Sequence, residues 1–340
     1  MAQNDTVQEK NIRFLGFPVL YRTPETGFAF GAGAYAAFKT NINDSVLRPS
    51  QVALGAVYTQ EKQFVSYLSY DLWLKSNFFY LKGEIAYNQF NYNFWGVGDE
   101  PRKIENFGVD FFRLRLENYY EIGSNWWLGL KFTLDDYDVV LRAEEGRLIT
   151  DKYTGSDGGF IFGSGLTTKY DTRDNIFFPT SGWNIQLSHE LFTESLGSDF
   201  NYNLNWLNVA KYIKINKKAV LALNVYNRTA IGEVPFFHMS LVGGSHRMRG
   251  YYEGYHRDNS MMGWQFEYRQ MLIRRFGAVV FIGNAMTSPT MFDYNLDRLH
   301  TTAGVGLRYC IDEAKKINIR LDYGFSKETS GFYFTIAEAF

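Results

Sequence analysis

The chain has one cysteine, Cys310, and only 7 prolines among 340 residues. A single cysteine excludes an internal disulfide framework. No run of about 18 apolar residues occurs, which excludes a membrane-spanning helix. Basic and acidic residues number 35 and 36, for a formal net charge of -1. The chain therefore has no basic excess that would indicate a nucleic-acid partner.

Aromatic residues, in contrast, are abundant. They make up 18% of the chain, with 24 Tyr, 30 Phe and 7 Trp. Such an excess is typical of a membrane β-barrel, in which aromatic side chains form a belt at each membrane–water interface. An aromatic-rich soluble β-sandwich is the alternative that composition alone leaves open.

Period-two alternation recurs from end to end and indicates β-strands. Near the C-terminus Ile319, Leu321 and Tyr323 alternate with Arg320 and Asp322. The segments from Trp183 and from Met262 show the same pattern. Charged residues fall on the polar face, which in a barrel wider than about eight strands lines a wet lumen.

The pattern predicts about sixteen strands, an even number, as single-chain bacterial barrels have. Their ranges are 12–22, 27–40, 49–60, 63–75, 77–91, 106–121, 124–141, 158–171, 181–193, 200–215, 217–231, 259–271, 275–286, 300–310, 316–326 and 330–340. We expect an all-β fold, a single transmembrane antiparallel β-barrel over residues 12–340. A short polar periplasmic segment, residues 1–11, precedes it. Long polar links at 92–105, 142–157 and 232–258 are expected to be outward loops.

Three segments carry a family resemblance. The first, Gly243–Tyr251, contains Met248-Arg249-Gly250-Tyr251. The second contains Asp171, Arg173 and Asp174, followed by Pro179 and Gly182, in the order D-x-R-D…P-x-x-G. The third consists of the strands 304–309, 319–323 and 332–334. Together they resemble the BamA/TamA superfamily of outer-membrane assembly and secretion barrels, which includes the FhaC-type transporters. The resemblance covers the chain from about residue 12.

The resemblance implies that the outward loop 232–258 folds back into the lumen, where acidic and aromatic side chains hold its arginine. A guanidinium in a partly dehydrated lumen must be paired, or it carries a large desolvation penalty. Glu267 is the first candidate partner of Arg249, and Asp322 is the second, although Arg320 competes for it. Gly283 stands where the family's F-x-D-x-G motif has its acid.

The last predicted strand ends in an aromatic residue. Phe332, Phe334, Ile336 and Phe340 are expected to share one face, as a C-terminal strand signal. Outer-membrane strands commonly end this way, because assembly machinery reads the terminal strand by β-augmentation.

The resemblance implies a non-enzymatic barrel without a cofactor, located in the outer membrane of a Gram-negative-type bacterium. Its expected function is the insertion or translocation of outer-membrane proteins. The resemblance also implies a lateral seam between the first and last strands, and Pro18 would weaken pairing there because it lacks a hydrogen-bond donor. Expected partners are outer-membrane lipid, with lipopolysaccharide as one candidate, and other outer-membrane or periplasmic proteins or lipoproteins.

Family insertases and two-partner transporters carry periplasmic POTRA modules, whereas only residues 1–11 precede the first predicted strand here. We therefore expect a barrel-only member, a fragment, or a subunit of a larger complex. The alternative functions are a scaffold or accessory barrel without insertase activity and, third, a passive channel.

Other candidate sites are discounted. His238, His246 and His256 have spacings that match no compact metal motif. Ser188 and His189 are adjacent in a predicted strand, so their side chains point to opposite faces and cannot form a hydrolase pair. No glycine loop of the phosphate-binding type occurs.

Overall fold

The computed structural model describes residues 12–23, 27–98, 103–141, 143 and 145–340. The expected N-terminal segment, residues 1–11, lies outside the described residues. Within them, no helix is both long enough and apolar enough to cross a membrane. The one α-helix in these ranges, α1 (Arg147–Thr150), is a single turn in the link after β7.

β-strands account for most of the described chain. The strands of the main sheet are β1 Ile12–Thr23, β2 Gly27–Phe38, β3 Ser50–Thr59, β4 Phe64–Leu74, β5 Phe79–Phe94, β6 Glu105–Gly123, β7 Trp126–Leu141, β8 Gly158–Asp171, β9 Gly182–Phe192, β10 Tyr202–Lys214, β11 Ala219–Gly232, β14 Ser260–Ile273, β15 Phe276–Ser288, β16 His300–Asp312, β17 Ile317–Ser326 and β18 Ser330–Ile336. β12 (Ser240–Val242) and β13 (His256–Asp258) form a separate small hairpin.

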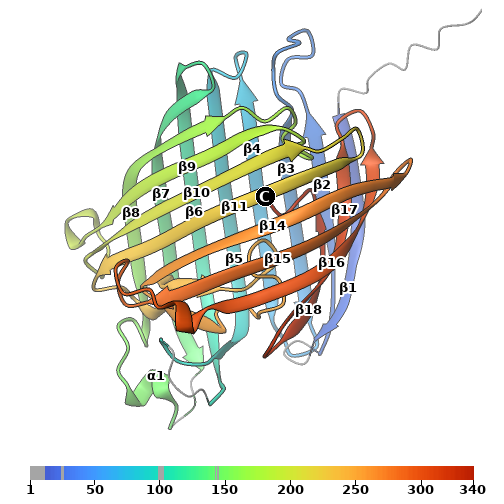
Figure 1. Cartoon of the computed structure of the whole chain (residues 1–340). Coiled ribbons are helices and arrows are strands. Elements are labelled where there is room, and N and C mark those ends of the chain that lie inside the picture. Colours follow the sequence, from blue (N-terminus) through green and yellow to red (C-terminus); the bar gives the residue numbers. More distant parts are fainter. Residues whose placement is uncertain (1–11, 24–26, 99–102, 142, 144) are drawn as a thin grey trace, which may run out of the picture.

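The main sheet has sixteen strands, and each pairs with its neighbours in chain order. All the pairings within it are antiparallel, and the sheet curls into a barrel (Figure 1). This confirms the predicted fold class and strand number. An even number of antiparallel strands brings the start of β1 and the end of β18 to the same end of the sheet.

The two faces of the strands differ in chemistry as the alternation predicts. Along β14, Gln265, Glu267 and Arg269 are buried on the inner face, whereas Phe266 and Tyr268 are exposed on the outer face. Because strand side chains alternate strictly, one register places every charge of β14 inside and every large aromatic outside.

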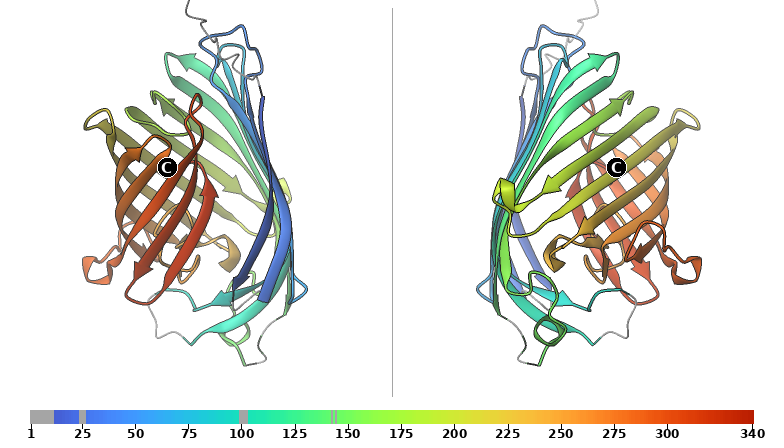
Figure 2. Two further views of the ribbon diagram at one scale, coloured as in Figure 1. Left: turned by 90° about the vertical axis from the view of Figure 1, so that its right-hand side faces the viewer. Right: turned by 90° about the vertical axis from the view of Figure 1, so that its left-hand side faces the viewer.

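The sheet is open between its first and last strands. Among the described residues, the strand order runs from β1 to β18 and no pairing joins these two strands. Figure 2 shows them lying apart along one side of the barrel. β1 pairs with β2 over twelve positions, whereas β18 pairs with β17 over only seven. The short length of β18 and the missing donor of Pro18 both limit pairing across this seam.

The segment between β11 and β14, residues 233–259, is called the lumen loop here. It contains a 3₁₀ turn, Phe236–His238, and the β12–β13 hairpin. Phe236 and Phe237 belong to an apolar cluster with inner-face residues of β5–β11. The ring of Phe237 stacks on that of Tyr137, with centroids 4.4 Å apart. Burial of these rings fixes the start of the loop against the barrel wall.

Candidate functional site: a charged network in the lumen

Arg249 lies at the tip of the lumen loop and is 1% exposed. One terminal nitrogen of its guanidinium donates to Glu267 of β14, and the other donates to Asp322 of β17. The guanidinium also lies 3.7 Å from the ring centroid of Phe281 on β15. The structure thus brings both candidate acids to Arg249 and adds an aromatic face. A planar guanidinium with several donors suits this arrangement better than an ammonium group does.

The backbone next to Arg249 passes very close to β17. Gly250 has a φ of +119°, and a Cβ built there would lie 2.7 Å from the backbone nitrogen of Phe325. On the strand side, a Cβ at Gly324 would lie 2.4 Å from the carbonyl oxygen of Arg249. Glycine is required at both positions because neither backbone leaves room for a side chain.

The loop tip is also tied to the last hairpin, β17–β18. The Tyr333 hydroxyl accepts a hydrogen bond from the Gly250 amide at 2.9 Å. Tyr251 donates through its hydroxyl to Glu328 at 2.6 Å. Met248 is buried beside Gly283. A Cβ added at Gly283 would lie 3.3 Å from the sulfur of Met248. The glycine that replaces the family's acid therefore makes room for Met248, and Asp322 provides the second carboxylate.

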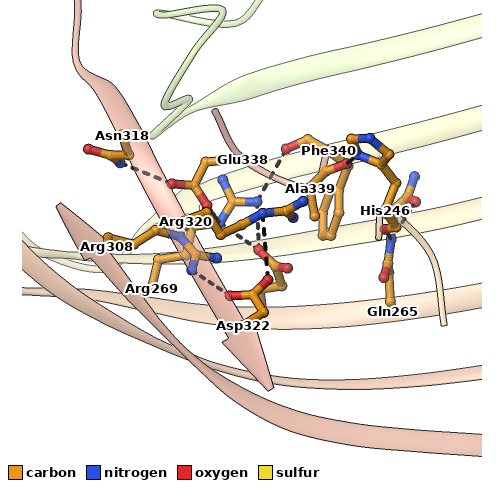
Figure 3. A network of polar contacts seen from close by, with 12 residues as sticks. His246, Gln265, Arg269, Arg308, Asn318, Arg320, Asp322, Glu338, Ala339 and Phe340 are labelled. Carbon is orange, nitrogen blue, oxygen red and sulfur yellow. Dashed lines mark hydrogen bonds and ion pairs between the residues drawn. The ribbon is translucent and has the colours of Figure 1, made fainter. Parts of the chain in front are cut away.

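Three arginines and three acids form a closed ring of ion pairs, called the charge ring here. In order around the ring they are Arg249, Glu267, Arg269, Glu338, Arg308 and Asp322. The nitrogen–oxygen distances are 2.7 Å for Arg269–Glu267, 3.9 Å for Arg269–Glu338, 2.8 Å for Arg308–Glu338 and 2.6 Å for Arg308–Asp322. Figure 3 shows most of these groups pointing toward one another in the lumen. Buried charges arranged this way compensate one another.

The D-x-R-D…P-x-x-G residues stabilise the link between β8 and β9. Arg173 donates to both oxygens of Asp171, at 2.9 and 2.7 Å. Asp174 accepts from the backbone amides of Thr180 and Ser181. Burial opposes ionisation of Asp174, but these hydrogen bonds outweigh it and lower its pKa.

The glycine and proline of this signature also have structural roles. Gly182 has a φ of +103°, and a Cβ there would meet the Thr172 carbonyl oxygen at 2.1 Å. Pro179 is buried in the link. The signature residues therefore shape a turn, and their described contacts do not include Arg249.

The C-terminal residues depart from the expected common face. Phe332 and Phe334 are 76% and 63% exposed on the outer face, and Ile336 is half-buried. Phe340 does not share that face, because β18 ends at Ile336 and Ala337 has a φ of +68°. The chain then turns into the lumen, where the Phe340 ring stacks on Tyr212 of β10.

The histidines that were discounted as ligands have other contacts. Tyr202 and His238 are hydrogen bonded at 2.6 Å, and His246 contacts the Ala339 carbonyl oxygen at 3.1 Å. The rings of His256 and His300 stack with centroids 3.3 Å apart. Over the residues that the structure describes, no group of three or more His, Cys, Asp or Glu side chains could hold a metal ion.

A cavity of about 1260 Å³ lies at the seam. β1 contributes Phe17, Val19 and Leu20 to its lining, and β18 contributes Phe334 and Thr335. Phe17 and Val19 belong to the inner face, whereas Leu20 and Phe334 belong to the outer face. The cavity therefore connects the lumen to the outer surface between the two unpaired strands.

Sequence reasoning missed Arg269, Arg308 and Glu338. The two arginines had a usable signal, because each occupies an inner-face position of an alternating strand. Glu338 also had a signal, because a continuous last strand would place this charge on the apolar face with Phe332 and Phe334. The chain instead leaves the sheet at Ala337.

Fold and site together describe an antiparallel β-barrel whose lumen holds a loop arginine against acids of the strands. A family model described as the Omp85 superfamily domain matches residues 29–340, and the chain belongs to the Omp85 superfamily. This membership relates it to barrels of outer-membrane protein assembly and secretion. Comparison with curated proteins gives no significant sequence match.

Solved structures share the fold at low sequence identity. BamA from Haemophilus ducreyi lacking POTRA domains 1–3 has a TM-score of 0.59 at 17% identity, over 96% of this chain and 70% of that one. CdiB from Acinetobacter baumannii has a TM-score of 0.63 at 12% identity, over 96% of this chain and 60% of that one. CdiB from Escherichia coli has a TM-score of 0.61 at 9% identity, over 97% of this chain and 63% of that one. The chain thus spans 60–70% of the length of these neighbours.

Proposed function

We propose that this chain is an integral outer-membrane barrel that inserts or translocates polypeptides, and that the client engages the seam between β1 and β18. The unpaired edges carry this proposal. A strand edge presents a row of free backbone donors and acceptors, which is a template for an added strand. The cavity at the seam supplies space beside those edges.

The outer surface supports a location within a bilayer. Large apolar side chains are exposed on the outer face around the barrel, among them Leu130, Leu166, Val280 and Leu307. Exposed apolar area on this scale requires lipid or a partner protein. We propose that lipid covers it, with lipopolysaccharide a candidate in the outer leaflet, and that any periplasmic partners dock at the end where β1 begins and β18 ends.

The proposed role requires no catalysis. Ser188 is buried on the inner face of β9, whereas the neighbouring His189 is exposed on the outer face. His189 forms its hydrogen bond with Asn205, at 2.8 Å. The two side chains therefore do not act as a nucleophile and base, and the proposed activity rests on strand edges and shape.

A cross-link across the seam tests the proposal. Leu20→Cys and Phe334→Cys place one thiol on each unpaired strand, both lining the cavity. The matched control joins Leu20→Cys to Phe30→Cys, which are paired neighbours on β1 and β2. Both pairs are made with Cys310→Ser and bridged with a short bis-maleimide.

The measurement is the folding of a small client barrel into liposomes that contain the bridged protein. The seam bridge should abolish assisted folding, while the control bridge should leave it intact. Full assistance from a protein bridged across the seam would disprove the role of the seam. Equal loss in both variants would show that the bridge itself damages the protein.

Purification from native membranes tests the accessory-subunit alternative. A stable complex of fixed stoichiometry, combined with no assisted folding by the isolated chain, would favour a scaffold role over insertion.

A further inference from the structure

The link between β15 and β16, residues 289–299, lies against the outside of the barrel and is called the wall loop here. Antiparallel order places it at the end of the sheet opposite the start of β1 and the end of β18. In both views of Figure 2 this orange-red segment projects sideways from the wall. The Asn295 side chain caps a 3₁₀ turn, Leu296–Arg298, by accepting from the Asp297 amide at 2.9 Å.

The wall loop covers polar side chains on the outer face of the sheet. Thr229 of β11, Ser260 of β14 and Ser288 of β15 are paired neighbours and form one row across three strands. Ser260 faces outward, because it is an even number of residues from the exposed Phe266. All three side chains of the row are nevertheless buried. An outward-facing side chain becomes buried when chain outside the sheet covers it, and the wall loop begins directly after Ser288.

Tyr294 fastens the wall loop to this row. Its hydroxyl accepts from the side-chain amide of Asn227 on β11 at 2.8 Å, and it is hydrogen bonded to the Ser260 hydroxyl at 2.5 Å. The Ser260 hydroxyl is in turn hydrogen bonded to that of Thr229 at 2.6 Å. The loop thus satisfies polar groups of the outer wall that would be costly to expose to hydrocarbon.

The polar row marks an edge of the apolar band on this side of the barrel. Farther from the wall loop, the equivalent outer-face row on the same three strands consists of Leu223, Phe266 and Ile282. Apolar outer-face positions of a membrane barrel contact acyl chains, and interfacial positions flank them. The change from an apolar to a polar row therefore places the wall loop at the level of a membrane–water interface.

The wall loop exposes large apolar side chains. Phe292 is 86% exposed, Leu296 is 73% exposed and Met291 is 46% exposed. Apolar groups gathered this closely indicate a covering lipid or protein. The charged residues of the loop are two acids and one base, so it has no cationic excess to attract anionic head groups. Attachment to a membrane would therefore depend on buried apolar area.

We propose that the wall loop is a membrane-interface anchor, which inserts Met291, Phe292 and Leu296 into the outer leaflet beside the barrel. This inference rests on the bilayer location in the proposed function but not on activity at the seam. Lipid is favoured over a protein because the lipid that covers Phe266 and Ile282 reaches the loop without a break. The anchor fixes the depth of β14–β16 in the bilayer.

Fluorescence quenching by nitroxide lipids measures the depth of the wall loop. A bimane label on Met291→Cys, made with Cys310→Ser, leaves Phe292 and Leu296 in place. The labelled protein is reconstituted into phosphatidylcholine liposomes. A nitroxide near the head group should quench the label several-fold more strongly than a nitroxide deep in the acyl chains.

Two further labelled positions calibrate the result. Leu307→Cys, exposed on the outer face of β16, should be quenched more strongly by the deep nitroxide. Ile149→Cys is exposed on α1, which lies beyond the strand ends (Figure 1), and neither nitroxide should quench it. Quenching at Leu307→Cys without quenching at Met291→Cys would overturn the anchor and leave the bilayer location standing. Absence of quenching at both positions would overturn the location as well.

Serine substitutions test whether apolar area holds the loop. Phe292→Ser combined with Leu296→Ser should reduce the shallow quenching at Met291→Cys several-fold. The matched control, Ile149→Ser combined with Leu196→Ser, removes two exposed apolar side chains from other links and should leave the quenching unchanged. Equal quenching in both double variants would overturn the anchor. Shallow quenching that appears only when the protein is diluted in lipid would assign the loop to a second copy and overturn lipid as its partner.

A nitroxide spin label on the same cysteine tests the attachment to the wall. Tyr294→Phe removes the hydroxyl that bonds to Asn227 and Ser260, and it should increase the mobility of the label in the electron paramagnetic resonance spectrum. Tyr58→Phe, at an exposed tyrosine of β3, should leave the spectrum unchanged. Identical spectra for Tyr294→Phe and the parent would overturn the fastening of the loop.

Discussion

At Arg249, two carboxylates and one aromatic face surround a single guanidinium. If this cation is removed, Glu267 and Asp322 remain buried with less compensation. Truncating one partner of a buried ion pair typically costs about 3–5 kcal/mol. Arg249→Ala should therefore lower the free energy of unfolding by about that amount, measured by urea titration in liposomes.

The free energy of unfolding of Arg249→Lys should lie between those of the parent and the alanine variant, because a lysine keeps the charge but not the planar guanidinium. The control is Arg275→Ala, whose partner Glu313 is exposed. Its unfolding curve should match that of the parent. A parent-like curve for Arg249→Ala would show that the loop arginine does not stabilise the barrel.

Gly250 gives a second test at the residue scale. Gly250→Ala introduces a methyl group against the backbone of Phe325 at a φ of +119°. Strain of this kind costs on the order of 1–3 kcal/mol, and the simplest relief is movement of the loop tip away from β17. Trypsin should then cleave the lumen loop faster. Gly123→Ala is the control, because a Cβ there meets nothing within 4 Å. Equal digestion of both variants would contradict the close approach.

At the scale of elements, the strands were largely predictable, whereas the last four residues, Ala337–Phe340, called the tail here, were not. For β17, alternation correctly assigned Asp322 to the lumen and Tyr323 to the outer face, because a buried face fixes the register. The pairing of Arg249 with two strands depends on a long loop crossing the lumen. Only the resemblance of Met248–Tyr251 to a family motif pointed there, since local pattern carries no information on such a contact.

The tail shows the physical limit of that reasoning. Phe340 falls on the same alternating face as Phe332, Phe334 and Ile336, so the pattern extends the strand to the chain end although Glu338 interrupts that face. The actual turn at Ala337 depends on charges that lie on β14 and β16, far away in sequence. Favourable contacts distant along the chain override the local preference for a longer strand.

Acid should loosen the contact between lumen loop and tail. The pKa of His246 is lowered from 6.5 to about 4, first by burial and then by the charges of Arg320, Arg247 and Arg249. The hydrogen bond to the Ala339 carbonyl raises this pKa but does not outweigh them. A base whose pKa is lower in the folded state than in the unfolded state contributes its full stabilisation to the folded state above pH 6.5. The stabilisation is lost as pH falls from 6.5 toward 4.

Protonation of Glu338 should loosen the same contact at lower pH. Burial and Glu267 oppose its ionisation, but Arg308 and Arg269 outweigh them and lower its pKa below 4.5. Exposure of the lumen loop should therefore rise as pH falls below 6.5, measured at each pH by hydroxyl-radical labelling of the loop side chains. His246→Gln should remove the part of this rise that lies above pH 4. An identical profile in the variant would exclude His246 as its source.

For the whole molecule, the lumen loop and the tail occupy space in the lumen through which ions would otherwise pass. The loop crosses the lumen from the Phe236 cluster to β17, and the tail fills space beside Tyr212. A porin-like lumen would leave an aqueous channel. The intact protein should therefore show little steady conductance in a planar bilayer, which distinguishes it from a passive channel.

Release of the two elements should change that conductance in a defined order. Glu338→Gln frees the tail and should produce brief openings, whereas Arg249→Ala frees the loop as well and should raise the steady current several-fold. Arg48→Gln, which breaks the ion pair with Asp171 of β8 outside the charge ring, should remain near the parent level. High steady conductance in the parent would contradict a lumen filled by its own chain. A parent-like Arg249→Ala would mean that the aromatic contacts of Phe236 and Phe237 hold the loop without the charge ring.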